Sequence, residues 1–320
     1  MRRWHRINRW QNWVGLLLVL FFVFGALAAP WLSPMDSKNP SAFQKVGPNK
    51  LVSSPLPPSK YALFGTLPNQ YDVFHALIWG ARDALVFGLI VALAAGVFGT
   101  IIGAIAGYSG GLYNGLIMRF ADAFLAFPAI AGLVFLRQLV ATAVQAGGGT
   151  YIFNAQFTGA FVDIVGTPSL TQRLLMSVNP LMLTLILFTW MPYARLINSM
   201  VISIRNLDFV QASRALGASP LRTIFRHLVP NSVGPAVVLM ARDVGSVVLL
   251  QATLTFIHIG GDSYWGDMLA LAHDWIIGPG GSIFTYWWTF IPATLALVLF
   301  GIGWNLLGDA LNDWLDPYSH

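Results

Sequence analysis

Six long apolar segments constrain the fold of this chain more than any other feature of its sequence. About 20 residues of α-helix, rising about 1.5 Å each, cross the ~30 Å hydrocarbon core of a bilayer. A backbone in lipid must satisfy its own hydrogen bonds, so each segment is expected to be a helix. The sequence therefore predicts an all-α polytopic membrane protein with six transmembrane helices, at residues 13–32, 84–106, 116–145, 174–194 (running on to 204), 233–259 and 286–308.

The composition agrees with a membrane protein and excludes several kinds of site. Hydrophobic residues make up 56% of the chain and charged residues only 10%, whereas soluble domains carry about 25% charged residues. Cysteine is absent, which excludes disulfides and thiolate metal ligands. The net charge of +5 comes from short basic blocks between apolar segments, a pattern of membrane topology rather than of nucleic-acid binding.

The charged residues also exclude one route to ATP hydrolysis. All 13 acidic residues are aspartates, and the last lysine is Lys60. The phosphate-binding loop G-x-x-x-x-G-K-[ST] needs a lysine, and no such motif occurs in the chain. Any energy from ATP is therefore expected to come from partner subunits, and the chain itself is expected to be neither an enzyme nor a cofactor protein.

The basic residues predict the orientation in the membrane. Cytoplasmic loops are enriched in Lys and Arg, and the loop after the fourth span holds Arg195, Arg205, Arg214, Arg222 and Arg226. Four arginines near the N-terminus place that end on the same side, and the outer loop 260–285 has no Lys or Arg. The predicted organisation is a cytoplasmic N-terminus with the first span (1–32), an external Pro-rich loop (33–81), a five-helix core with a cytoplasmic loop at 205–231 (82–308), and a cytoplasmic tail (309–320).

The N-terminal segment admits a second interpretation. A basic start, an apolar run and Ala26-Leu27-Ala28 resemble a secretory signal with its cleavage site. Against this, the apolar run is long, and Trp4, Trp10 and Trp13 are typical of an interfacial anchor. We therefore predict an uncleaved first helix.

A polar island between the fourth and fifth spans carries strong helix signals. Asp208 is a good N-cap, and Gln211 three residues on would complete a capping box. Gly217 is suited to end this helix. Ser219 is suited to cap a second helix with Pro220 at its first position, where the missing N–H costs nothing. The sequence predicts helix, glycine turn and helix.

The second of these helices has one apolar stripe, formed by Leu221, Ile224, Phe225 and Leu228. Pro230 is expected to interrupt it where the chain re-enters the membrane. The physics leaves two interpretations open. In the first, a partner protein binds the island, whose small residues allow close approach. In the second, the helix lies on the lipid surface with its arginines at anionic headgroups.

The sequence of the island is similar to a known motif. Residues 210–219 read V-Q-A-S-R-A-L-G-A-S, and R-H-L-V-P-N follows at 226–231. This run resembles the EAA loop of ABC-importer permeases, and most closely the C-type subunit of dipeptide, oligopeptide and nickel importers, where V-E-A-A-R-A-L-G-A-S precedes R-H-x-L-P-N. Further matches follow in family order along 60–320: A-G-Y at 106–108, P-Y-A-R at 192–195, W-G-D-M-L at 265–269 and N-L-L-G-D at 305–309.

The resemblance implies a type I ABC-importer permease fold in a bacterial inner membrane. It implies half of a translocation path for peptides or similar small solutes, completed by a homologous second permease. One or two cytoplasmic ATPase subunits, which hold the ATP and Mg, would bind the loop, and an extracytoplasmic substrate-binding protein would deliver cargo. The implied ATPase-coupling residues are Asp208, Gln211, Ala212, Ser213, Arg214, Ala215, Leu216, Gly217, Ser219, Pro220, Arg222, Arg226 and Pro230.

The chain departs from the family pattern in places. Gln211 replaces the usual glutamate and Ser213 the second alanine, which puts a charge-dependent ATPase contact in doubt. In the outer G-T-D-x-x-G-R-D segment, Leu67 replaces the first Asp and Tyr71 the Arg. The loop 147–173, with Tyr151, Phe153, Phe157 and Phe161, looks longer than usual; it either packs over the outer mouth or forms an ordinary surface loop.

Three charged residues lie near membrane depth. Asp122 and the pair Arg242-Asp243 either lock helix packing or act in transport. The histidines lack ligand spacing, so no metal site is predicted. Glycines recurring in the second span predict a face that packs closely on another helix.

The predicted function is therefore an import permease subunit with unknown substrate-path residues. Peptides are the default cargo, with nickel chelates and oligosaccharides as alternatives. A secondary transporter would need coupling-ion groups at the midplane, which are not evident. A membrane scaffold that binds a cytoplasmic partner without transport is the remaining rival.

Overall fold

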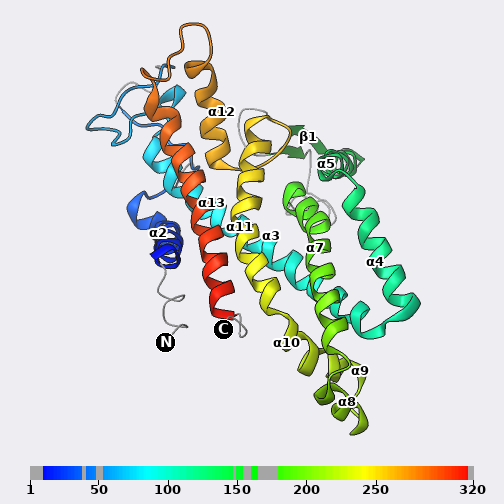
Figure 1. Ribbon diagram of the computed structural model, residues 1–320. Coiled ribbons are helices and arrows are strands. Elements are labelled where there is room, and N and C mark those ends of the chain that lie inside the picture. The colour runs from blue at the N-terminus through cyan, green and yellow to red at the C-terminus, as the bar shows by residue number, and fades with distance from the viewer. Residues whose placement is uncertain are drawn as a thin grey trace.

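The computed structural model describes residues 10–37, 41–47, 53–146, 149–153, 160–164 and 179–315, and these form an elongated helical bundle (Figure 1). The spanning helices are α2 (Trp10–Leu32), α3 (Val73–Ser109), α7 (Pro180–Ile204), α11 (Gly234–Phe256) and α13 (Trp287–Leu315). The remaining elements are η1 (Pro68–Gln70), α4 (Gly111–Ala126), α5 (Ala129–Ala146), β1 (Gly149–Phe153), β2 (Ala160–Ile164), α8 (Asp208–Ala215), α9 (Pro220–Thr223), η2 (Ile224–Leu228), α10 (Val229–Ser232) and α12 (Tyr264–Ile276).

The count of six spans is confirmed, but the third span differs from its prediction. Five described helices are long and apolar enough to cross a membrane, and α4 with α5 makes a sixth when the bent pair is counted as one. The two helices meet at 85°, so the predicted continuous helix 116–145 is wrong. The cause is Pro128, because a proline pushes the preceding residue out of the α region, and Phe127 is extended, with φ −84° and ψ 130°.

Close packing of α3 on α7 forms the centre of the bundle, and it depends on glycine. A Cβ added at Gly99 would lie 2.7 Å from Tyr193 Cβ, and one at Gly103 would lie 2.9 Å from Ala194 Cα. A Cβ at Gly107 would lie 2.9 Å from Val201 Cβ. The predicted glycine face of the second span is therefore confirmed, because these positions let two helix backbones approach one another along several turns.

A second packing layer joins α11, α13 and α2 to the other side of α3. Trp265 is 1% exposed, and its ring meets Phe22 and Phe300 edge to face at centroid distances of 5.8 and 5.7 Å. Phe22 belongs to α2, Trp265 to α12 and Phe300 to α13, so one aromatic cluster joins these three helices. Edge-to-face aromatic pairs each contribute about 0.5–1.5 kcal/mol beyond their buried area.

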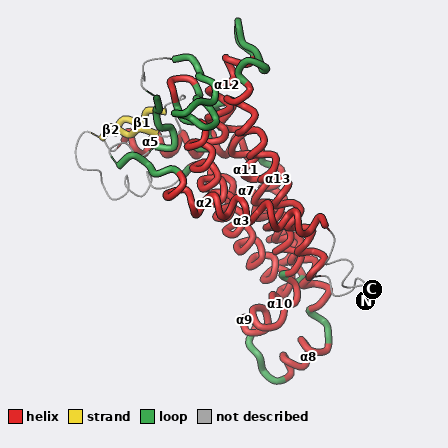
Figure 2. The backbone as a smooth tube through the Cα atoms, turned by 90° about the vertical axis from the view of Figure 1, so that its left-hand side faces the viewer, coloured by secondary structure: helices red, strands yellow, loops and turns green. Residues whose placement is uncertain are grey.

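The first and last described helices meet at the end of the bundle where the polar island lies. Asn12 Nδ2 of α2 donates to Asp313 Oδ2 of α13 at 3.4 Å. The start of α11 lies beside the end of α13, at Gly234 and Leu315. Figure 2 shows α8 and α9 at this end and α12 at the other. The arrangement agrees with the predicted common side for the first span, the 205–231 loop and the last helix; that this side is cytoplasmic stays a prediction.

The Pro-rich loop ends earlier than predicted and is folded against the bundle. Helix α3 begins at Val73 rather than after residue 81, and Asp72 caps it by accepting a hydrogen bond from Phe74 N at 3.0 Å. Trp288 Nε1 of α13 donates to Thr66 O at 3.2 Å, and Leu67 is fully buried. The described parts of this loop therefore form a cap over the ends of α3 and α13.

The loop after α5 contains a short β-hairpin, which adds two strands to an otherwise helical fold. β1 and β2 pair antiparallel, with Tyr151 opposite Val162. Figure 1 places the hairpin beside α5. Phe157 and residues 165–178 lie outside the described residues, as does the predicted start of the fourth span at 174. Within the described part, that span begins at Pro180, where Asn179 caps it by accepting from Met182 N at 3.0 Å.

The α3–α7 contact gives a stability prediction. Gly103→Leu forces a side chain into the backbone of α7 at Ala194. The free energy of unfolding should therefore fall by about 1–3 kcal/mol, or the chain should fail to fold. Gly25→Leu is the matched control, because a Cβ there meets nothing within 4 Å. Thermal unfolding of both variants in detergent checks this. A Gly103→Leu variant with the unfolding midpoint of the Gly25→Leu variant would contradict the proposed role of the glycine.

Candidate functional site

The polar island projects from the ends of α7 and α11, and its first helix begins differently from the prediction. The N-cap residue of α8 is Leu207, whose carbonyl accepts from Val210 N and Gln211 N at 2.9 and 3.1 Å. Asp208 is the first helical residue, and its side chain caps nothing. Gln211 Nε2 donates instead to Asn206 O at 2.9 Å. The predicted capping box is wrong, because the helix begins one residue earlier than predicted. Asp208 lies at the first helical position instead of the N-cap position.

The glycine turn after α8 is confirmed. Gly217 has φ +82°, which few residues besides glycine adopt readily. Ala218 N donates to Ser213 O at 3.1 Å, and Gly217 N donates to Arg214 O at 2.9 Å. These two bonds are those of a Schellman motif, which satisfies carbonyls at the helix end. The turn therefore has a fixed geometry and reverses the chain within a few residues.

The second helix starts as predicted but does not stop at Pro230. Ser219 Oγ accepts from Arg222 N at 3.3 Å, and Pro220 occupies the first turn of α9. The chain then makes a π-helical turn, η2, in which Val229 N donates to Ile224 O, and continues into α10. A π turn widens the helix just where the ring of Pro230 would clash with the preceding turn. The predicted break is therefore a local widening.

The apolar stripe of the second helix divides into a buried and an exposed half. Ile224 and Leu228 are 3% and 0% exposed, and they pack with Val210 of α8 in the core around α7. Leu221 and Phe225 are exposed, so only half of the apolar stripe is buried against the bundle. Leu216, at the tip of the turn, is 89% exposed. The loop thus presents three apolar side chains outward while being held firmly from within.

Two arginines fasten the island to the end of α3, a role that the sequence did not reveal. Arg205 Nη1 donates to Gly107 O at 2.8 Å. The guanidinium of Arg214 lies over the ring of Tyr108, 4.6 Å from its centroid. A basic residue in a loop usually indicates a solvated side chain, so only the fold could show these contacts. Arg214 connects α8 directly to α3, and Arg205 connects the end of α7, just before α8, to the same turn of α3.

The predicted coupling residues are brought together on this one projection. Ser213 is half-buried, and the others are exposed: Asp208, Gln211, Ala212, Arg214, Ala215, Leu216, Gly217, Ser219, Pro220, Arg222, Arg226 and Pro230. Exposure at so many adjacent positions leaves a continuous surface available to a partner.

Asp122, Arg242 and Asp243 contact residues of neighbouring helices. Arg195 of α7 pairs with Asp122 of α4. Tyr193 Oη donates to Asp243 Oδ2 at 2.6 Å, whereas Arg242 pairs with Asp309 of α13. Arg242 and Asp243 therefore bind different helices rather than each other, which supports the packing interpretation over a role in transport.

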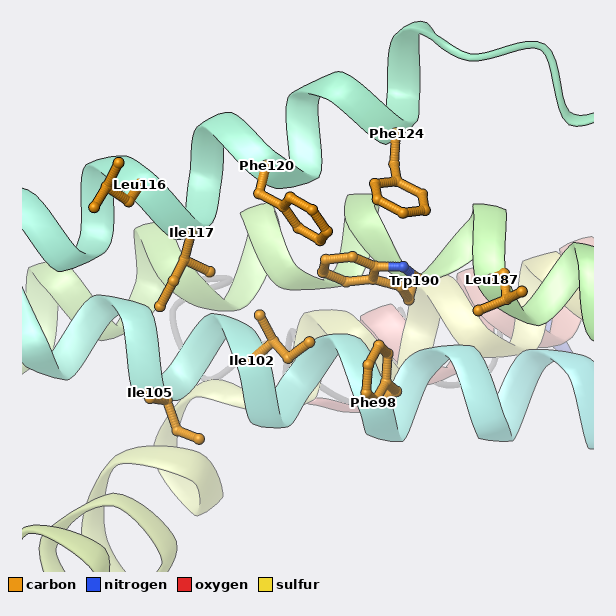
Figure 3. A pocket seen from close by; sticks show the side chains of 9 residues that line it. All are labelled: Phe98, Ile102, Ile105, Leu116, Ile117, Phe120, Phe124, Leu187 and Trp190. Atoms are coloured by element: carbon orange, nitrogen blue, oxygen red, sulfur yellow. The ribbon is translucent and has the colours of Figure 1, made fainter. Parts of the chain in front are cut away.

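A hollow on the side of the bundle formed by α3, α4 and α7 is apolar. A groove of about 570 Å³ between α3, α4 and α7 is lined by the carbon-rich side chains of Phe98, Ile102, Ile105, Leu116, Ile117, Phe120, Phe124, Leu187 and Trp190. Figure 3 shows Phe120 of α4 directed toward the ring of Trp190 of α7. Such a surface offers no partner for the charged ends of a polar solute. Within the described ranges, no group of three His, Cys, Asp or Glu residues could hold a metal ion.

The arginine anchor gives a second prediction. Arg205→Met removes a charge-assisted hydrogen bond of about 1–3 kcal/mol to Gly107 O. Amide hydrogen exchange in α8 should therefore quicken about 5- to 10-fold. Arg222→Met is the control, because the side chain of Arg222 is exposed on the same projection. Equal exchange in the two variants would show that Arg205 does not hold the island.

Comparison with known proteins places this geometry in a family. Residues 99–318 match the model of the binding-protein-dependent transport system inner membrane component. A dipeptide transport system permease protein of Alkalihalophilus pseudofirmus is 31% identical over 307 residues, covering 95% of this chain and 84% of the relative. A di/tripeptide transport system permease protein of Pseudomonas aeruginosa is 32% identical over 307 residues, with 95% and 86% covered.

A probable D,D-dipeptide transport system permease protein of Escherichia coli K12 is 29% identical over 305 residues, covering 94% of this chain and 84% of the relative. The family match covers more than half of the chain, and it includes the whole island and the α3–α7 contact from Gly99 onward. This chain belongs to the family of binding-protein-dependent transport system inner membrane components, and it is a multi-pass permease subunit of the bacterial inner membrane.

Proposed function

We propose that this permease imports short peptides and that the island at 205–231 couples it to ATPase subunits. The cargo class rests on the relatives, whose names specify dipeptide, di/tripeptide and D,D-dipeptide transport. These names favour peptides over the nickel chelates and oligosaccharides that the sequence left open. The coupling role rests on the geometry of the island.

The observation that carries the coupling role is the exposed apolar tip on a rigid support. Leu216 is 89% exposed, and Leu221 and Phe225 are exposed beside it. Figure 2 shows α8 and α9 extending away from the end of the bundle. A helix that binds the lipid surface would lay its apolar face along the membrane. An apolar tip that points away from the bundle fits a pocket on a protein partner.

The supports of the tip suggest how force reaches the membrane. Arg205 and Arg214 tie the island to the end of α3, and Ile224 and Leu228 bury against the core around α7. Helices α3 and α7 pack backbone to backbone through glycines. A push on the tip therefore moves α3 and α7 as one body, and rigid-body rocking of this kind would alternate access to the path between two permeases.

The proposed complex has one partner for each of these parts of the molecule. A homologous second permease completes the path, one or two ATPase subunits bind the island and supply ATP and Mg, and a substrate-binding protein docks at the opposite end, over the cap and α12. The family description itself names dependence on a binding protein. No ATP-binding loop occurs in this chain, so hydrolysis belongs to the partners.

The test is a substitution at the tip. Leu216→Asp places a charge in the apolar contact and should lower ATP hydrolysis stimulated by peptide-loaded binding protein at least about tenfold in vesicles containing the whole complex. Leu112→Asp is the matched control, because Leu112 is 85% exposed at the turn into α4, outside the island. Unchanged stimulated hydrolysis in Leu216→Asp, with the complex assembled, would refute coupling through this loop.

A further inference from the structure

The turn between α11 and α12, residues 257–263, forms an elbow at the end of the bundle opposite the island. His258, Gly260 and Gly261 have φ of 58°, 133° and 155°, which reverse the chain sharply. Ser263 then caps α12 by accepting from Gly266 N at 3.2 Å. The elbow carries Asp262, a partly buried carboxylate that the coupling role does not use.

Four acidic or amide side chains from distant parts of the chain meet at this elbow. Gln251 Nε2 of α11 donates to Asp83 Oδ2 of α3 at 3.4 Å. The backbone N–H of Tyr264 also donates to the Asp83 carboxylate, which Asp262 faces as a like charge. Asp262 Oδ2 accepts from Asn179 Nδ2 at 2.6 Å. Two carboxylates are thus held near each other by the fold.

The charges of this cluster do not balance within the described part of the chain. Arg137 of α5 faces Asp262, and its guanidinium also donates to Ile259 O. The charge that faces Asp83 is the like charge of Asp262, whereas Arg137 faces Asp262. The guanidinium of Arg82 lies over the ring of Trp79 instead, 5.4 Å from its centroid. Burial raises the pKa of Asp262, against the lowering effect of Arg137 and Asn179. Like charges at reduced dielectric repel strongly, so one more positive charge is needed.

An oxygen without a partner points to where that charge resides. Gln251 is 0% exposed, and its Oε1 is buried with no hydrogen-bond partner among the described residues. The unpaired Oε1 belongs to the same amide group whose Nε2 donates to the Asp83 carboxylate. A buried acceptor left unsatisfied costs about 1–3 kcal/mol. Carboxylate and amide oxygens are the donors that small hard cations prefer.

We propose that Asp83, Gln251 and Asp262 form a site for one small monovalent cation, which is either a proton shared by the carboxylates or an alkali ion held by their oxygens. The bound charge fastens the elbow to α3, because Asp262 lies on the elbow and Asp83 on the helix. Loss of the cation leaves two facing anions and loosens the elbow. The site concerns this chain alone and does not depend on its cargo or on its ATPase partner.

The proposal is tested by thermal unfolding of the full chain in detergent, followed by tryptophan fluorescence. In buffers free of alkali ions, the bound cation is a proton. Because the folded state holds this proton more tightly than the unfolded state does, its loss at higher pH lowers the stability of the fold. The unfolding midpoint of the wild type should therefore fall by about 2–5 °C between about pH 5 and pH 8. At the upper pH, sodium or potassium chloride should restore the midpoint, relative to choline chloride, if an alkali ion can occupy the site.

Two single variants and their combination give the decisive comparison. Asp83→Asn or Asp262→Asn removes the excess negative charge, so each midpoint should become insensitive to pH and to alkali ions. The double variant leaves Arg137 without either carboxylate and should unfold at a lower temperature than both single variants. Asp274→Asn, whose side chain is 92% exposed, is the control and should retain the wild-type dependence.

Separate variants distinguish the cation site from other titratable groups near the elbow. Tyr264 faces both carboxylates and Asp267, and His258 and His273 line a neighbouring hollow together with Asp267. A variant with both histidines replaced by Gln should keep the pH dependence. The proposal is overturned if the wild-type midpoint responds to neither pH nor alkali ions, if Asp83→Asn keeps the wild-type slope, or if the slope disappears with the two histidines.

Discussion

The backbone contact between α3 and α7 is the constraint on which the rest of this permease depends. Gly99, Gly103 and Gly107 lie where any side chain would meet α7. In lipid, helix association lacks the hydrophobic drive present in water, so close van der Waals packing of small residues must supply it. Every other described layer is arranged on this pair, with α11, α13 and α2 on one side and the bent pair α4–α5 on another (Figure 1).

Helix α3 also connects the two ends of the molecule. It is 37 residues long, about 55 Å at 1.5 Å per residue, well beyond the ~30 Å of the hydrocarbon core. Its last turn binds the island through Gly107 and Tyr108. Near its start, Asp83 meets the α11–α12 elbow. One rigid element therefore contacts both the proposed ATPase-docking tip and the proposed cation site, so a change at either end acts on the same helix.

The sequence predicted the features that depend on local chemistry. The number of spans followed from segment length and apolarity, and the turn at Gly217 and the start at Ser219-Pro220 followed from backbone preferences. The capping box failed because α8 begins at Asp208, with Leu207 at the N-cap position although leucine is a poor N-cap, and Val210 is buried in the core in this arrangement. The π turn before Pro230, the anchors Arg205 and Arg214, and the Asp83–Asp262 pair depend on residues distant in sequence, which no local pattern reports.

If a partner ATPase binds the tip at Leu216, a probe on that residue should cross-link to the ATPase. The chain has no cysteine, so Leu216→Cys introduces a single thiol at a position that is 89% exposed. A short photoactivatable maleimide on this thiol, within the assembled complex, should cross-link to an ATPase subunit and shift its mobility on a denaturing gel. The same label at Leu112→Cys should give little of this product. Efficient labelling at Leu216 with no ATPase adduct, or with adducts to lipid alone, would contradict the account.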